Sequence, residues 1–118
     1  MAKSVRGGRT AVNRLPNHAR AVFPKDKLKN YLLNPSKDAN KSQAFSDIGY
    51  NMKNADRLEA DIRNGLKNNK ATLFTPNNYG TPAQVEMMLG VTKQRKIITA
   101  WMIDKGTNAP RFITAYPA

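Results

Sequence analysis

The chain has one imidazole, that of His18, which directly follows the run Leu15-Pro16-Asn17. An imidazole can take up and release a proton at physiological pH, which makes His18 a candidate general acid or base for phosphodiester cleavage. A histidine close to the start of a folded domain can equally be an ordinary surface residue. The sequence leaves both interpretations open.

A second candidate is Lys41, at the expected start of a helix, with Tyr50 just beyond the end of that helix. The lysine ammonium can hold a phosphate, and the N–H groups at a helix N-terminus add donors for an anion. Both side chains are expected beside a sheet, where Tyr50 would contact RNA. The alternative is a solvated lysine and a tyrosine at the edge of the core.

The third candidate is the last expected strand, residues 111–116. Side chains alternate between the two faces of a strand, so Phe112, Thr114 and Tyr116 are expected on one face. Two hydroxyls near a phosphate and a ring for base stacking would suit RNA, and Arg111 would reach phosphate from the edge. Ordinary hydrogen bonding at a sheet edge would use the same threonine and tyrosine.

Hydrophobic spacing predicts the elements that must position these residues. Pro24 is suited to begin the first of three helices, and Asn34-Pro35 ends it. The helices are marked by Leu28, Leu32 and Leu33, by Ala44, Phe45 and Ile48, and by Leu58, Ile62 and Leu66. Alternating or continuous apolar runs then predict strands over residues 71–75, 83–89, 97–103 and 111–116. Helices followed by hairpin-connected strands indicate an α+β fold with a twisted antiparallel sheet of about four strands.

Composition narrows the class of protein. The 118 residues include 20 Lys and Arg against 8 Asp and Glu, a formal net charge of +12. This surplus points to a polyanionic partner, nucleic acid before an anionic membrane. With no cysteine and one histidine, disulfide frameworks, thiol nucleophiles and Cys- or multi-His metal sites are excluded. A carboxylate site for a hard cation is not excluded by these counts, but the interpretation preferred here needs no metal or cofactor. No apolar run approaches the roughly 18 residues of a membrane span, so no stable membrane association is expected.

The basic, glycine-containing stretch 1–14 predicts a linker or flexible arm, which is either a remnant of a longer protein or a segment that follows a phosphate backbone. Residues 15–118 are then expected to form a single domain. Removing residues 1–20 would leave the rest of the chain basic by +7, so the charge argument holds for the folded part as well.

Several short motifs spread over roughly residues 15–117 occur together. They are Leu15-Pro16-Asn17, Lys27-Leu28, Tyr31-Leu32-Leu33-Asn34-Pro35, Lys41 with Phe45, Gly49-Tyr50, Trp101-Met102-Ile103 and Pro110-Arg111-Phe112-Ile113-Thr114-Ala115-Tyr116-Pro117. This set resembles the C-terminal nuclease toxin domains of bacterial polymorphic toxins, including contact-dependent growth-inhibition effectors. In the resemblance, motif positions match Lys41, Tyr50, Thr114 and Tyr116, and His18 follows the Leu-Pro-Asn start.

The resemblance implies a fold like that of barnase, colicin and RelE-type ribonucleases. It further implies a metal-independent ribonuclease that cleaves tRNA in the target-cell cytoplasm, delivered as part of a larger secreted or cell-surface toxin. An acidic immunity protein would neutralise it, and a host translation elongation factor could assist it. On this reading His18, Lys41, Thr114 and Tyr116 are catalytic, and Tyr50, Arg111 and Phe112 bind RNA.

Three alternatives remain at the level of the sequence. A non-enzymatic nucleic-acid-binding module would have the same charge and aromatic residues. A metal-dependent enzyme acting on DNA would need carboxylates such as Asp47, Asp56 and Asp104, which are scattered over different expected elements. A membrane-active toxin would need a strongly amphipathic basic helix with an aromatic face, a pattern that the sequence lacks.

Overall fold

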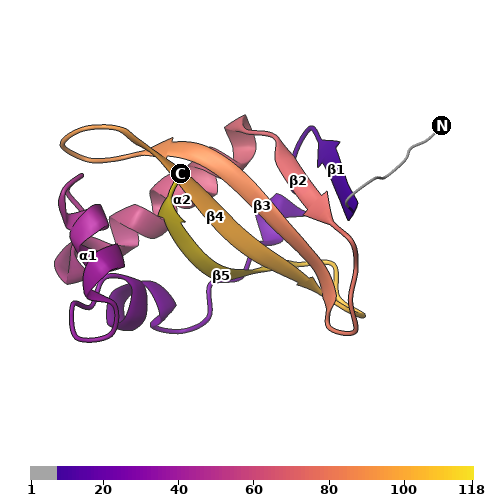
Figure 1. Cartoon of the computed structure of the whole chain (residues 1–118), viewed down its shortest axis with the longest axis horizontal. Coiled ribbons are helices and arrows are strands. Elements are labelled where there is room, and N and C mark those ends of the chain that lie inside the picture. The colour runs from indigo at the N-terminus through magenta and orange to yellow at the C-terminus, as the bar shows by residue number, and fades with distance from the viewer. Residues whose placement is uncertain (1–7) are drawn as a thin grey trace.

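Five antiparallel strands form one sheet in the order β1-β2-β3-β4-β5, so each strand pairs with its neighbour in sequence (Figure 1). The computed structural model describes residues 8–118. The strands are β1 (Arg9–Val12), β2 (Ala71–Phe74), β3 (Gly80–Leu89), β4 (Arg95–Asp104) and β5 (Pro110–Pro117). Helices precede four of the five strands, which confirms the α+β class.

Two α-helices and three short helical segments lie between β1 and β2. They are η2 (His18–Arg20), η3 (Lys27–Leu32), α1 (Ala39–Ser46), η4 (Met52–Asn54) and α2 (Ala55–Asn68). The first helix is shorter than predicted, because Asp26 adopts a left-handed backbone with φ of 63° and regular turns begin only at Lys27. The helix α1 begins at Ala39, two residues before the expected start at Lys41, because the Asp38 carboxylate caps it by accepting a hydrogen bond from the Lys41 backbone N–H at 3.0 Å.

One face of the sheet is covered and the other is open. The helix α2 packs against β3 on the covered face, behind the strands in Figure 1. Its four-residue apolar repeat, Leu58, Ile62 and Leu66, is fully buried there, as the periodicity predicts. From the sheet, every second residue of β3 and β4 points into the same core, including Trp101. Polar side chains that could meet a ligand must therefore come from the alternate positions.

The strand β1 corrects two expectations, that residues 1–14 form a flexible arm and that the sheet has about four strands. Residues 9–12 pair with β2 in register, Arg9 opposite Phe74 and Val12 opposite Ala71, and so form a fifth strand instead of a flexible arm. Charge and glycine content suggested a linker, but an edge strand needs little more than free backbone groups on its neighbour. The Arg9 guanidinium also lies 6.0 Å from the centre of the Phe74 ring. The rest of the predicted arm, residues 1–7, lies outside the described residues.

A bulge in β5 decides which of its side chains reach the open face. Thr114 lies opposite Ala100, but Phe112, two residues earlier, lies opposite Trp101. The extra residue, Ile113, shifts the alternation by one position. Phe112 therefore turns into the core, while Thr114 and Tyr116 point to the open face. The expectation that all three share a face is wrong for Phe112.

Candidate active site

Lys41, near the beginning of α1, reaches the open face of β5. Its ammonium Nζ donates a hydrogen bond to Thr114 Oγ1 at 3.0 Å, and it lies 5.9 Å from the centre of the Tyr116 ring. The helix α1 packs against β5, which holds the lysine at this position. One packing contact between a helix and a strand thus brings Lys41 to two predicted site residues, Thr114, which lies 73 positions later in the sequence, and Tyr116.

Gln84, two strands away on the same open face, forms a hydrogen bond with the Tyr116 hydroxyl. The amide Nε2 of Gln84 on β3 donates a hydrogen bond to the Tyr116 oxygen at 3.1 Å. A phenol accepts and donates, so this contact leaves the Tyr116 proton available to a bound molecule. Sequence reasoning missed Gln84. The signal that could have found it is the alternation of β3, in which Gln84 lies between the buried residues Ala83 and Val85 and so faces away from the core.

Asp38 completes the cluster. Its Oδ2 lies 4.0 Å from Lys41 Nζ, and the two side chains are 39% and 33% exposed, respectively. An ammonium carries three N–H donors, so its hydrogen bond to Thr114 still leaves donors for a ligand oxygen, while Asp38 at 4.0 Å forms only an ion pair. We define the Lys41 cluster as Asp38, Lys41, Gln84, Thr114 and Tyr116. It combines a cation, a carboxylate, an amide and two hydroxyls on one accessible surface.

His18 is not part of this cluster. It lies in η2, which packs against α2 on the helical side of the molecule. No hydrogen bond or ion pair joins its ring to Lys41, Thr114 or Tyr116 within residues 8–118. The structure therefore separates the predicted proton-transfer histidine from the other predicted catalytic residues.

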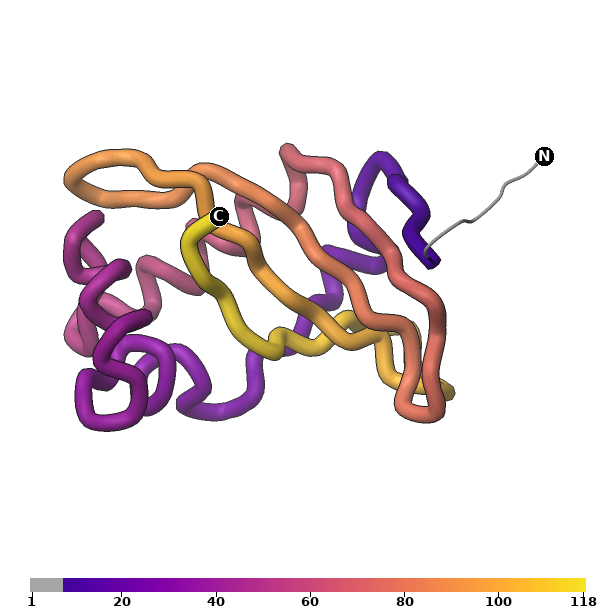
Figure 2. Tube along the Cα trace, in the orientation of Figure 1, coloured from indigo at the N-terminus to yellow at the C-terminus, as the bar shows by residue number. Residues whose placement is uncertain are grey.

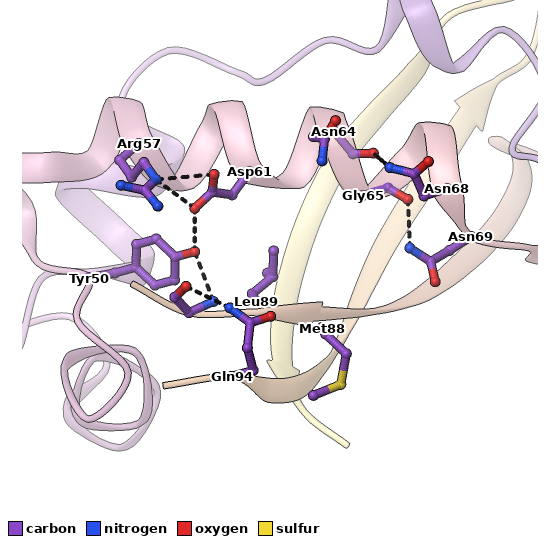
Figure 3. A pocket seen from close by; sticks show the side chains of 11 residues that line it. Tyr50, Arg57, Asp61, Asn64, Gly65, Asn68, Asn69, Met88, Leu89 and Gln94 are labelled. Atoms are coloured by element: carbon purple, nitrogen blue, oxygen red, sulfur yellow. Dashed lines mark hydrogen bonds and ion pairs between the residues drawn. The ribbon is translucent and has the colours of Figure 1, made fainter. Parts of the chain in front are cut away.

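Tyr50 is fully buried, so it cannot contact RNA, and that prediction is wrong. Its hydroxyl donates to Asp61 Oδ2 at 2.6 Å and accepts from the Gly90 N–H at 3.1 Å, as Figure 3 shows. Arg57 Nε donates to the same carboxylate oxygen at 3.0 Å. Burial, together with the hydrogen bond to Asp61, raises the pKa of Tyr50 far above its usual value. Tyr50 ties α2 to the end of β3 and serves the fold.

Phe112 is also fully buried, which overturns its predicted contact with RNA. Its ring stacks on Phe23 with centroids 5.1 Å apart and meets Trp101 edge-on at 5.4 Å. These three rings form an aromatic part of the core beneath β4 and β5. The bulge places Phe112 there.

Arg111 lies near the beginning of β5 and is engaged with Asp104 at the end of β4. The guanidinium donates two hydrogen bonds to the carboxylate, from Nε at 2.8 Å and from Nη2 at 2.9 Å. The bidentate pair holds the pKa of Asp104 below its usual value. Arg111 lies opposite Met102, on the same open face as Thr114, so it borders the Lys41 cluster with its charge largely satisfied.

Two classes of site can be checked directly within residues 8–118. In this range no group of three or more His, Asp or Glu side chains is placed to hold a metal ion. The carboxylates of Asp47, Asp56 and Asp104 therefore do not gather into the site that a metal-dependent DNA enzyme would need. None of the helices in the described range is long and apolar enough to cross a membrane.

Comparison with known proteins identifies a family and nothing closer. No curated protein and no solved structure matches the chain. One family does match, and it covers everything from just after β1 to the last residue. Because the match to "Domain of unknown function (DUF6883)" extends over residues 14–118, the chain belongs to that family.

Proposed function

We propose that the domain is a metal-independent ribonuclease and that the Lys41 cluster is its active site. The observation that carries the proposal is the convergence of Lys41, Thr114 and Tyr116 on an open sheet face, with Nζ 3.0 Å from the threonine oxygen. A cation and two hydroxyls on one exposed surface are the groups that a phosphodiester needs. The net charge of +12 supports RNA as the ligand.

In the proposed reaction, the ribose 2′-oxygen attacks the adjacent phosphorus and the bond to the 5′-oxygen breaks. The products are a 2′,3′-cyclic phosphate and a free 5′-hydroxyl. Lys41 and Thr114 bind the non-bridging oxygens and stabilise the charge that collects on them. Tyr116, oriented by Gln84, gives its proton to the leaving oxygen, and the Asp38 carboxylate accepts the proton of the 2′-hydroxyl. Tyr116 and Asp38 thus take the proton-transfer roles for which the sequence suggested His18 as general acid or base.

The resemblance to polymorphic toxin domains supports a more specific version of this proposal. The domain would cleave tRNA in the cytoplasm of a target cell after delivery by a larger secreted or surface protein. An acidic immunity protein would neutralise it by covering the Lys41 cluster, and an elongation factor could present the tRNA. These partners follow from the resemblance, and the basic charge of the chain is compatible with them.

The test is cleavage of total tRNA by the purified protein in the presence of a chelator. We expect fragments with cyclic phosphate ends from the wild type. Lys41→Gln should lower the cleavage rate by about 10²–10³, because one cationic donor to the transition state is lost. Tyr116→Phe should lower the rate by about 10²–10⁴, because the proton donor is lost.

Lys67→Gln is the matched control, since it removes one exposed lysine from α2 and should cleave like the wild type. Intact tRNA with the wild type, even after cell extract is added, would reject the ribonuclease proposal. If the same protein then bound RNA in a salt-sensitive way without cleaving it, the alternative of a binding module would be supported.

A further inference from the structure

A small pocket lies directly beside the Lys41 cluster. Lys41 and Thr114 form one side of it, while Lys27 and Tyr31 of η3 form another. Its volume is about 230 Å³. Pockets that enclose a drug-sized molecule usually span roughly 300–1,000 Å³, so this one has room for a ring or a sugar, but not for a whole enclosed nucleotide.

The aromatic side of this pocket is unusually accessible. Tyr31 is 58% exposed, whereas Phe45, Tyr50 and Phe112 are fully buried. The position is fixed by the backbone, because Leu28 and Leu32 on the same segment are buried in the core. Their burial leaves the Tyr31 ring projecting outward at the mouth of the pocket.

Two further cations surround the ring. Lys27 Nζ lies 5.5 Å from the centre of the Tyr31 ring, and Lys37 Nζ lies 5.9 Å from it. Lys27 and Lys41 line the pocket together with the single carboxylate of Asp38, and Lys37 adds a third ammonium group beside the Tyr31 ring. An exposed ring bordered by cations offers one surface for a flat base and charges for the phosphates attached to it.

We propose that Tyr31 is a nucleotide subsite, a proposal that rests on the ribonuclease function given above. An unpaired base next to the scissile phosphate stacks on the Tyr31 ring, and Lys27 and Lys37 bind the phosphates of that nucleotide. Stacking of a base on an aromatic ring is stronger than an exposed cation–π contact, so the base displaces an ammonium from the ring. The displaced lysine remains close enough to pair with phosphate.

This subsite sets the substrate class. A base can lie on Tyr31 only when it is free from its own stack and pair, which is the condition in loops and single strands. The domain should therefore act on unpaired segments of RNA and leave regular duplex intact.

The experiment measures binding separately from cleavage. The probe is a fluorescent single-stranded oligoribonucleotide whose 2′-oxygens are methylated, which blocks the attacking group, and its affinity is read by fluorescence anisotropy. Tyr31→Ala should weaken binding roughly 5- to 150-fold, while Tyr31→Phe, which keeps the ring, should stay within about twofold of the wild type. A duplex of the same length should bind more weakly than the single strand.

Tyr79→Ala is the matched control. Tyr79 is 76% exposed and belongs to the turn between β2 and β3. Followed by its colour in Figure 2, this turn lies at the opposite end of the molecule from η3. Its loss should leave affinity unchanged. The double variant of Lys27 and Lys37 to glutamine should reduce the slope of log affinity against log salt by roughly 1.4, about 0.7 for each phosphate contact.

The outcomes separate the two proposals. If Tyr31→Ala binds the single strand as well as the wild type, or if Tyr79→Ala loses as much affinity, the subsite is refuted whether or not the protein cleaves RNA. If binding depends on Tyr31 and the wild type cleaves no RNA, the ribonuclease proposal fails and the base-stacking site stands. Circular dichroism of each variant checks that the exposed substitutions leave the fold intact.

Discussion

A lysine and a threonine separated by 73 positions meet at 3.0 Å, and this contact defines the proposed site. Lys41, Thr114 and Tyr116 were all expected from the sequence, and the structure brings these three together. Their catalytic role remains a prediction. The partners that orient them, Gln84 and Asp38, were not expected, because each is an ordinary polar residue until the register of the sheet and the cap of α1 are known.

Two of the residues that sequence reasoning misplaced, besides His18, are large aromatic residues of the core. Tyr50 and Phe112 were assigned to RNA because rings stack on bases, but both are fully buried. An aromatic side chain serves a core and a binding surface equally well, and its type does not distinguish them. Exposed Tyr31, which belongs to one of the sequence motifs but has no role in the predicted site, is the opposite case.

Tyr50 gives a prediction about alkaline stability. Above pH 10 the tyrosine of the unfolded chain loses its proton, whereas folded Tyr50 keeps it because burial raises its pKa. The unfolded state then binds fewer protons, so the free energy of unfolding should fall as pH rises, by up to about 1.4 kcal/mol per pH unit. Tyr50→Phe should remove this part of the pH dependence, as measured by urea unfolding between pH 7 and 11.

At pH 7 the same substitution should destabilise the protein by about 1–3 kcal/mol, because Asp61 and the Gly90 N–H lose their partner. Tyr79→Phe, at an exposed position, serves as the control and should change neither quantity. A Tyr50→Phe protein with the full alkaline loss of the wild type would show that the buried hydroxyl is not responsible.

At the scale of elements, the contact between α2 and β3 depends on a glycine. A Cβ atom at Gly65 would lie 2.4 Å from Met87 Sδ, closer than two such atoms can approach. Gly65→Ala should therefore cost about 1–3 kcal/mol by overpacking, offset by up to about 1 kcal/mol of helix propensity. The free energy of unfolding in urea measures the difference.

A double-mutant cycle tests whether the clash with Met87 is what destabilises Gly65→Ala. Met87→Ala alone should cost about 2–5 kcal/mol, because it leaves a cavity in the core. If the clash with Met87 is what penalises Gly65→Ala, the double variant should be more stable than the sum of the two losses by about 0.5–3 kcal/mol. Strict additivity would mean that the alanine is accommodated without touching Met87.

Periodicity predicted most of these elements, because Leu58, Ile62 and Leu66 repeat every four residues and β2 to β5 alternate or run apolar. Periodicity failed where a strand or a bulge depends on contacts with residues far away in the sequence. Residues 9–12 become a strand only because β2 offers a free edge. The bulge at Ile113 depends on how β5 packs against β4, and no local signal in residues 111–116 reveals it.

At the scale of the whole molecule, acidic residues are mostly used in pairs. Asp61, Glu59 and Glu86 each form an ion pair with a basic residue, as do Asp38 and Asp104 in the contacts described above. With 20 basic residues against 8 acidic ones, most lysines and arginines remain to attract a polyanion. We therefore expect the surplus of positive charge as a whole to attract RNA, whereas the proposed cleavage chemistry takes place only at the Lys41 cluster.

This division predicts different salt dependences for two kinetic quantities. The KM for tRNA should rise steeply between 50 and 200 mM salt, since each phosphate contact contributes a slope of about 0.7–0.9 in log affinity. The kcat should change little, because Lys41 and Tyr116 act locally on the bound phosphate. Cleavage rates measured across tRNA and salt concentrations separate the two. A KM that does not respond to salt would contradict the role given to the surface charge.

The fifth strand has a consequence for self-association. The family match begins at residue 14, so β1 lies outside it, and without β1 the strand β2 would be the edge of the sheet. An uncovered edge offers free backbone donors and acceptors to any other strand, including that of a second copy. At the opposite edge, Val22 bonds to Pro110 and Phe112 and covers the start of β5. In this chain β1 covers β2, and the edge that stays open is then a strand of only 4 residues that carries Arg9, two features that disfavour edge-to-edge pairing.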